Sequence, residues 1–319
     1  MTNLSFLKMK EAMLHHSLIT SDITPYFKSS AKVQLDREGV FVGEIPRMSE
    51  AMKANSECFG HPFWGPDYLE KSHRGDIFRS RYQAATGSLD HKVVVDIGCG
   101  PGNFYATVGG SPKTLIGVDV SYGAVQMAKK VGYIPLRADA QNLPLVDNFA
   151  DLVVATATIH HCDDMAKALS ESARLVRPGG LLMTDLDPQI TANNFKGLAA
   201  FLRKHRFPIY RLINSPYYLT EEYRKLRRAT EAHNKVPGDG IAPEMYYQTL
   251  EPLGFEVKLY PHNMHYVGAE VLDGKIGQLP LRLRILQRMS GINPDTPEAA
   301  QSIMCIARKK VCAKKSTLD

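Results

Sequence analysis

A run of β-branched residues that leads into three alternating glycines is the most informative segment of this chain. Residues 93–97 read Val-Val-Val-Asp-Ile, and Gly98, Gly100 and Gly102 follow. β-Branched residues favour strands. Glycine has no Cβ, so its backbone can adopt positive φ and approach a bound molecule closely. The segment therefore predicts a buried strand, with Asp96 near its end, followed by a turn that cradles a ligand.

The spacing of the glycines separates two kinds of ligand site. A dinucleotide fingerprint reads Gly-x-Gly-x-x-Gly, and its third glycine packs the next helix against the sheet. This chain reads Gly-x-Gly-x-Gly instead, with Asp96 two residues before the first glycine. The turn thus departs from a pyrophosphate site. Taken alone, an ordinary strand-to-helix connection is the alternative interpretation.

Four further segments follow in order along the chain. The first is an apolar strand that ends in an acid, and the second is an acidic turn. The third is a strand that leads into two histidines, and the fourth is a helix followed by a Pro-Gly-Gly turn and a strand. They occupy residues 115–121, 135–144, 149–161 and 168–185. The acid of the first, Asp119, and its neighbour Ser121 are also residue types that cap helix N-termini. No single segment identifies the site, but the five segments in this order indicate one kind of ligand site.

The five segments together resemble the class I S-adenosylmethionine-dependent methyltransferases. More specifically, they are similar to the methyltransferase type 11 branch, which includes ubiquinone and menaquinone biosynthesis enzymes and many natural-product O-methyltransferases. The resemblance implies an α/β fold with a Rossmann-like, seven-stranded sheet, parallel except for an antiparallel last strand. Helices flank this sheet, and helical lids are inserted. The implied cofactor is S-adenosyl-L-methionine, with S-adenosyl-L-homocysteine as product.

The same resemblance implies a set of cofactor-binding residues. In such enzymes an acid at the position of Asp119 accepts hydrogen bonds from both ribose hydroxyls, and an Asp-Ala pair lies beside the adenine. Cys99 is expected to fill space in the turn rather than to act as a nucleophile. The implied residues are Asp96, Gly98, Cys99, Gly100, Gly102, Asp119, Val120, Asp139, Ala140, Gln141 and Thr156.

A side chain from the segment before the first core strand can reach the methionine carboxylate in related enzymes. Arg79, Arg81 and Tyr82 are the candidates, because they lie on an amphipathic stretch over residues 68–85. Solvation at the surface is the alternative for each.

Methyl transfer needs a base only when the acceptor atom begins protonated. Histidine suits that task because its pKa lies near neutrality. His160 is the predicted catalytic residue, as a base or as a donor that orients the acceptor, since it follows the fourth strand. Alternatively, His160 and His161 only order this loop. His262 and His265 are second candidates.

The chain is long enough for additions around the methyltransferase core. We expect an N-terminal helical extension or cap (1–89), a core (90–188 and 250–310), an inserted basic helical lid for substrate (189–249), and a second insertion between the last two strands (265–300). Residues 196–235 hold ten Lys or Arg against three Glu. Such a lid can attract an anionic substrate, an acidic carrier protein, a membrane surface or nucleic acid. A solvated helix face is the alternative.

Composition favours a reduced, cytoplasmic compartment. The five cysteines (58, 99, 162, 305 and 312) are odd in number and form no Cys-x-x-Cys pair, so neither a disulfide framework nor a metal site is expected. The first twenty residues carry no long apolar signal region. An apolar run of eighteen residues, as a membrane span requires, is also absent from the sequence.

The leading hypothesis is O-methylation of a metabolite or natural product, the substrate being a small molecule that is anionic or carrier-bound. Base N-methylation of nucleic acid is not expected, because residues 156–160 read Thr-Ala-Thr-Ile-His rather than Asn/Asp-Pro-Pro-aromatic. One alternative is C-methylation of a prenylated quinol during peripheral membrane contact. Another is a non-catalytic cofactor-binding partner protein. The sequence does not reveal the oligomeric state.

Overall fold

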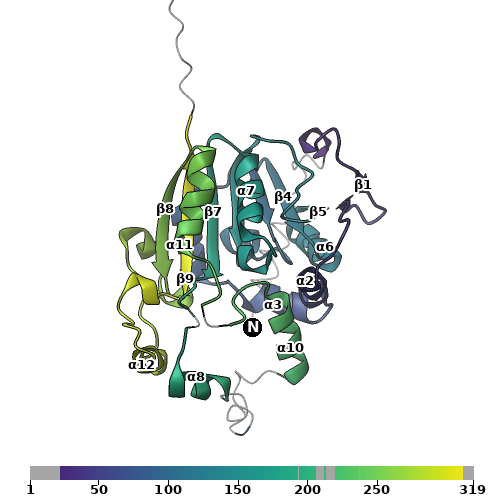
Figure 1. Cartoon of the computed structure of the whole chain (residues 1–319). Coiled ribbons are helices and arrows are strands. Elements are labelled where there is room, and N and C mark those ends of the chain that lie inside the picture. The colour runs from purple at the N-terminus through teal and green to yellow at the C-terminus, as the bar shows by residue number, and fades with distance from the viewer. Residues whose placement is uncertain (1–21, 193, 206–211, 213–219, 237, 312–319) are drawn as a thin grey trace, which may run out of the picture.

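The computed structural model describes residues 22–311 except 193, 206–211, 213–219 and 237. Its strands are β1 (Val33–Leu35), β2 (Phe41–Gly43), β3 (Val93–Ile97), β4 (Thr114–Asp119), β5 (Ile134–Arg137), β6 (Ala150–Thr156), β7 (Val176–Pro188), β8 (Phe255–His262) and β9 (Ser302–Lys309). They form one mixed sheet with the order β1-β2-β5-β4-β3-β6-β7-β9-β8 (Figure 1).

The α-helices of the described residues are α2 (Glu50–Gly60), α3 (Trp64–Lys71), α4 (Asp76–Thr86), α5 (Asn103–Val108), α6 (Tyr122–Val131), α7 (Met165–Leu175), α8 (Gly197–Lys204), α10 (Glu221–Thr230), α11 (Pro243–Leu250) and α12 (Leu281–Met289). Short 3-10 helices are η2 (Thr24–Tyr26), η3 (Ile159–His161), η4 (Glu251–Leu253), η5 (Met264–Tyr266), η6 (Ala269–Asp273) and η7 (Pro297–Ala299).

The predicted seven-stranded sheet is confirmed by β3 to β9. Strands β5, β4, β3, β6 and β7 are parallel, and β9 runs antiparallel between β7 and β8. Two further strands extend the sheet beyond the predicted seven. β2 pairs in parallel with β5, and β1 pairs antiparallel with β2. Each has three residues, too few for alternation of polar and apolar residues to reveal them in the sequence.

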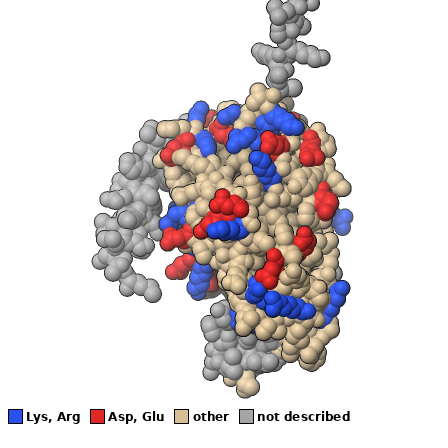
Figure 2. Space-filling view, turned by 90° about the vertical axis from the view of Figure 1, so that its left-hand side faces the viewer, with Lys and Arg blue, Asp and Glu red and all other residues tan. Residues whose placement is uncertain are grey.

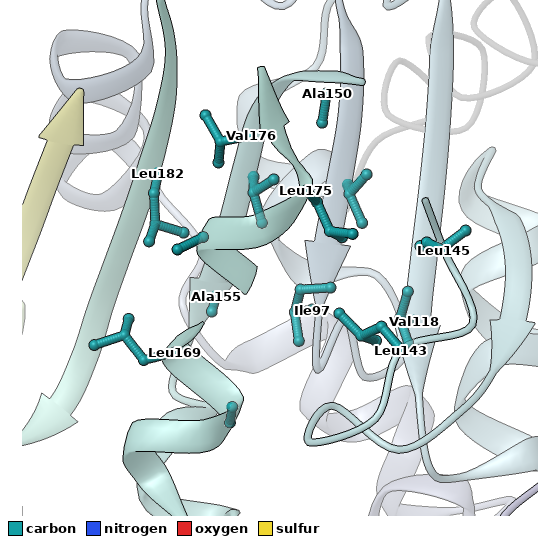
Figure 3. Packing of buried hydrophobic residues seen from close by; sticks show 14 of the residues in the cluster. Ile97, Val118, Leu143, Leu145, Ala150, Ala155, Leu169, Leu175, Val176 and Leu182 are labelled. Carbon is teal, nitrogen blue, oxygen red and sulfur yellow. The ribbon is translucent and has the colours of Figure 1, made fainter. Parts of the chain in front are cut away.

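Two layers of helices cover the sheet. On one face α7 and α11 pack against a cluster that includes Ile97, Val118, Leu169 and Leu182 (Figure 3). On the other face α4, α5 and α6 contribute Phe78, Phe104, Val125 and others to a second cluster. Because both faces are covered, β3 is buried throughout and reads as an apolar run rather than an alternating one.

The predicted turn at Pro178-Gly179-Gly180 is part of β7. Ala150 of β6 pairs with Val176, but Leu152 already pairs with Leu181, so the residues between them bulge. Gly179 has a φ of +80°, which glycine adopts without a Cβ clash. The bulge lets β7 begin directly where α7 ends.

The amphipathic stretch before the core, residues 68–85, covers the end of one helix and most of the next. α3 ends at Lys71 and α4 begins at Asp76, after Gly75 with a φ of +96°. Figure 1 shows α2, α3 and α10 gathered at the end of the sheet where the parallel strands finish. The first 21 residues of the predicted N-terminal extension lie outside the described residues, and the domain boundaries stay a prediction.

The basic stretch near the C-terminus forms α12, whose charges are partly paired. Arg284 lies 2.7 Å from Asp295, and Arg288 lies 3.6 Å from it. Figure 2 views the side of the molecule on which β8 and α12 lie, and positive and negative side chains are interspersed there. None of the helices in the described part of the chain has the length and apolar character needed to cross a bilayer.

Candidate active site

The glycine turn folds as the alternating glycines predict. Gly98 and Gly100 have φ values of +64° and +51°. A Cβ on Gly98 would lie 2.4 Å from the Thr158 side chain, whereas the space around Gly100 is open. The turn is tied to the neighbouring strand, because the Gly100 amide donates to Asp119 Oδ2 at 2.9 Å and the Cys99 amide to the Val118 carbonyl at 3.0 Å.

A pocket opens at this turn. The structure brings together most of the predicted cofactor residues along one wall of the pocket: Gly98, Cys99, Gly100, Asp119, Val120, Asp139, Ala140, Gln141 and Thr156. They come from the ends of β3, β4, β5 and β6, which lie side by side in the sheet. In an open parallel sheet, ligands bind outside the carboxyl ends of the strands, and this pocket lies there.

Asp119 is positioned by backbone amides. Its Oδ2 accepts from Gly100 and its Oδ1 accepts from the Ser121 amide at 2.8 Å. Burial raises the pKa of Asp119 and these backbone hydrogen bonds oppose the shift. Each carboxylate oxygen can accept a second hydrogen bond, so both remain able to receive a ribose hydroxyl.

Asp96 and Gly102 do not line the pocket, which corrects their assignment as cofactor contacts. Asp96 is fully buried and accepts a hydrogen bond of 2.6 Å from the Tyr133 hydroxyl. Burial raises the pKa of Asp96 to about 7, although the bond from Tyr133 lowers it. A Cβ on Gly102 would lie 3.1 Å from the Tyr133 ring and 3.2 Å from Val131. Both residues support the turn from beneath.

The second wall of the pocket consists of side chains that the sequence analysis missed. Met52, Asn55 and Phe59 of α2 line it, together with Tyr68 and His73. Phe59 and Tyr68 meet edge to face, with ring centroids 5.0 Å apart. Burial lowers the pKa of His73 to about 4. The only signal in the sequence is the helical spacing of Met52, Asn55 and Phe59, which equally describes a packed helix.

The three candidates for the methionine carboxylate do not reach the pocket. Arg81 is buried and pairs with Asp185, Nε to Oδ2 at 2.9 Å. Tyr82 is buried beside Phe104. Arg79 binds Asp76 at 3.1 Å on the surface. The hydrophobic spacing of α4 places Arg81 and Tyr82 on its buried face, so these candidates were wrong.

His160 is also displaced from its predicted role. It is buried outside the pocket lining, with Nδ1 2.7 Å from Asp187 Oδ1 and Nε2 3.3 Å from Glu231 Oε2. Burial lowers the pKa of His160, but the Asp187 hydrogen bond and the Glu231 charge outweigh it, so the pKa lies above its usual value. Because carboxylates occupy both ring nitrogens, His160 cannot reach an acceptor in the pocket as a base.

His161 lines the pocket instead. Its Nδ1 lies 2.7 Å from the Thr230 carbonyl, which can only accept, so Nδ1 carries the proton and Nε2 the lone pair. Burial and the neighbouring His160 lower the pKa of His161 well below its usual value. The two second candidates lie elsewhere: His262 binds Asp185 at 2.6 Å, and His265 packs against Phe78.

Comparison with known proteins agrees with this geometry. Residues 95–184 match the model of a methyltransferase domain. The chain is 35% identical over 95 residues to a tRNA (carboxymethyluridine(34)-5-O)-methyltransferase of Arabidopsis thaliana, spanning 28% of this chain and 23% of the relative. It is 32% identical over 100 residues to a malonyl-[acyl-carrier protein] O-methyltransferase of Hamiltonella defensa, spanning 31% and 39%. It is 28% identical over 149 residues to a ubiquinone biosynthesis O-methyltransferase of Thiobacillus denitrificans, spanning 44% and 61%.

The family match includes the glycine turn, and the chain covers less than two thirds of the length of each of the three relatives. They agree with the pocket on the cofactor, because the matched segment supplies the strand ends that form its first wall. The chain therefore carries a methyltransferase domain of the class I S-adenosylmethionine-dependent kind, with S-adenosylmethionine as its cofactor.

Proposed function

We propose that this protein transfers the methyl group of S-adenosylmethionine to an oxygen atom of a small-molecule acceptor. The observation that carries the proposal is the composition of the pocket. One wall consists of the cofactor motifs, and the other of Met52, Asn55, Phe59, Tyr68 and His73, while His161 also lines the pocket. Aromatic and polar side chains of this kind bind and orient an organic acceptor.

The geometry suits an in-line displacement. The acceptor oxygen, the methyl carbon and the sulfur must line up, and two walls that hold donor and acceptor can supply that alignment. Orientation of two reactants contributes roughly 7–11 kcal/mol in favourable cases. Residues of α2 and α3 line the pocket opposite the strand ends, and their cover reduces the access of water to the reacting atoms.

Support for oxygen as the acceptor atom comes from the relatives. Each of the three relatives described above is named as an O-methyltransferase. Their acceptors differ in class, including a carrier-bound malonyl group and a tRNA base. An anionic or carrier-bound small molecule fits the ten Lys or Arg among residues 196–235.

The test is calorimetric titration with S-adenosylmethionine and S-adenosylhomocysteine, followed by a transfer assay with labelled methyl donor. A malonyl thioester on acyl carrier protein and a simple catechol serve as acceptor probes. Micromolar binding of both cofactor forms and a labelled methyl ester or ether would support the proposal. Cofactor binding without transfer to any metabolite of the producing cell would favour a non-catalytic binding protein, and absence of binding would refute the cofactor site.

A second candidate, C-methylation of a prenylated quinol at a membrane surface, is favoured by a separate observation. α8 packs beside α12, and both expose large apolar side chains next to basic ones. These apolar residues are Leu198, Phe201 and Leu202 on α8 and Leu281, Ile285 and Met289 on α12. Exposed apolar side chains flanked by Lys and Arg are typical of helices that lie in a membrane interface.

Flotation with vesicles of phosphatidylglycerol and phosphatidylcholine tests this second candidate. The wild-type chain should float with the anionic vesicles, and F201S with I285S should not. Leu35, which is exposed on β1 at a distant edge of the sheet, provides the matched control L35S. Failure of the wild-type chain to bind these vesicles would count against the quinol and leave the soluble acceptor.

A further inference from the structure

A cluster of three potential metal ligands lies beside the methyl-transfer pocket. His160, His161 and Glu231 each place one ligand atom within 4.8 Å of the other two. The histidines come from η3, and Glu231 directly follows α10. Seventy residues separate Glu231 from His161, so only the fold brings them together. The cofactor motifs do not account for this cluster.

The other nitrogen of each imidazole is already engaged. Asp187 Oδ1 lies 2.7 Å from Nδ1 of His160, and the Thr230 carbonyl lies 2.7 Å from Nδ1 of His161. Metal-binding histidines commonly donate one ring N–H to a carboxylate or a backbone carbonyl, which fixes the ring and leaves the other nitrogen for the metal. Both rings are held in this manner. On His161 the lone pair lies on Nε2, whereas Nε2 of His160 faces Glu231 and must give up its proton when a metal binds.

The separation of the ligand atoms fits a small cation. Nε2 of His160 and Oε2 of Glu231 are 3.3 Å apart. Oε2 is buried and has no hydrogen-bond partner in the described part of the chain, so this contact is not a hydrogen bond. Zinc bonds to nitrogen and oxygen are about 2.0–2.1 Å. Two ligands on a tetrahedron of that size are about 3.3–3.4 Å apart, which matches the observed separation.

The charged groups around the cluster favour the binding of a cation. Asp187 and Glu231 face it with two carboxylates, and the second oxygen of Asp187 is also buried without a hydrogen-bond partner among the described residues. Arg227 on α10 brings one positive charge close to both histidines and to Glu231. Arg227 is one positive charge beside two carboxylates, of which Asp187 is fully buried and Glu231 is 17% exposed, and buried charge is costly unless it is compensated.

We propose that His160, His161 and Glu231 bind a divalent transition-metal ion of the Zn²⁺ class. Three protein ligands leave one position open, which is the arrangement of catalytic rather than structural zinc sites. Because His161 also lines the cofactor pocket, a metal ion at the cluster would lie beside that pocket. If the proposed methyl transfer is correct, the open position suits an acceptor that carries a hydroxyl or carboxylate oxygen.

The experiment uses the full-length chain after treatment with EDTA and dialysis. Calorimetric titration with Zn²⁺ should show one site, and Co²⁺ should give the visible absorption of a four-coordinate complex. E231Q and H161Q should each weaken Zn²⁺ binding by at least about tenfold and abolish the Co²⁺ band, since each removes a ligand. D187N should weaken binding about 10- to 100-fold while the band persists, because Asp187 only orients His160.

Matched controls remove the same chemical groups elsewhere. E222Q changes an exposed glutamate in the first turn of α10, and H205Q changes an exposed histidine at the end of α8. Both should bind Zn²⁺ like the wild-type chain. Circular dichroism of each EDTA-treated variant verifies that it is folded.

Either of two outcomes would overturn the metal site. One is the absence of stoichiometric Zn²⁺ binding to the wild-type chain. In that case a protonated His160, rather than a metal ion, balances the charges of Asp187 and Glu231. The other is equal binding to wild type, E231Q and H161Q, which would mean adventitious surface binding. The experiment contains no methyl donor, so its failure is distinguishable from failure of the proposed function, which cofactor titration tests.

Discussion

Burial gives Asp96 a role that its place in the glycine motif does not reveal. The carboxyl group lies under the turn, bonded to Tyr133, and its pKa is about 7 because burial disfavours the charge. An unfolded aspartate ionises near pH 4. Folding therefore holds a proton on Asp96 across this interval, and the stabilising contribution present below about pH 4 is lost as the pH rises to about 7.

The variant D96N tests this titration. Its amide cannot ionise and can still bond Tyr133. Relative to wild type, D96N should gain stability as the pH rises from about 4 to 7, by up to about 4 kcal/mol for a shift of roughly three pKa units. Urea unfolding of both proteins at several pH values measures the difference. Parallel stability curves for the two proteins would show that folding does not raise the pKa of Asp96.

Asp119 is the single residue on which cofactor affinity should depend most directly. D119A removes a charged acceptor from the ribose hydroxyls and also frees the Gly100 amide. Losing a hydrogen bond to a charged group costs about 1.5–3 kcal/mol, so the dissociation constant for S-adenosylhomocysteine should rise about 10- to 150-fold. Calorimetry measures it, with D163A as control because Asp163 is exposed outside this pocket. Equal affinities would refute the ribose contact.

At the scale of elements, the buried pair of Arg81 and Asp185 fastens α4 to the sheet. Arg81 also donates to the carbonyls of Met264 and Val267 at 2.6 and 2.8 Å, which ties in the segment after β8. His262 binds the other oxygen of Asp185. The positive neighbours lower the pKa of Asp185 to about 2 in spite of burial. One guanidinium thus joins α4, β7 and η5.

Breaking this pair should destabilise the whole chain. R81M leaves Asp185 buried without its guanidinium partner, which typically costs about 3–5 kcal/mol. R79M removes an exposed pair two residues away and should cost no more than about 1 kcal/mol. Thermal and urea unfolding compare the two variants. A loss of similar size in both would mean that the buried pair contributes no more than a surface one.

At the scale of the whole molecule, the pocket joins segments from across the chain. Its lining runs from Met52 to Cys162, and the Asn55 side chain binds the Thr230 carbonyl at 2.8 Å, which links α2 to the end of α10. A ligand in the pocket therefore contacts elements that must stay assembled for it to bind. Binding to the folded chain alone raises the free energy of unfolding.

The expected size of that effect follows from mass action. At a ligand concentration of about 100 times the dissociation constant, S-adenosylhomocysteine should stabilise the chain by about 2.7 kcal/mol. For a chain of this length the melting temperature should rise by about 4 °C. Differential scanning calorimetry measures the shift, and adenosine at equal concentration provides a comparison. An unchanged melting temperature would mean that the pocket does not hold the cofactor.

The part of the site that could be predicted consists of residues close together in the chain and next to strand ends. Gly98, Gly100 and Asp119 were found because parallel strands place their carboxyl ends at one edge, so a motif at each end implies proximity. The second wall could not be found this way. Tyr68 reaches the pocket from α3 and His73 from the connection between α3 and α4. The docking of these segments depends on packing, and the two residue types carry no cofactor signature.

The sequence by itself determined the parallel core and the cofactor class, because strand periodicity and glycine spacing are local properties. That Asp119 faces the ribose stays a prediction. Only the tertiary structure decided which histidine faces the pocket. His160 and His161 are neighbours with the same chemistry, but the carboxylates of Asp187 and Glu231 face the first, and the Thr230 carbonyl holds the second at the pocket. Those partners lie 27 to 71 residues away, and their choice depends on how η3, β7 and α10 pack together.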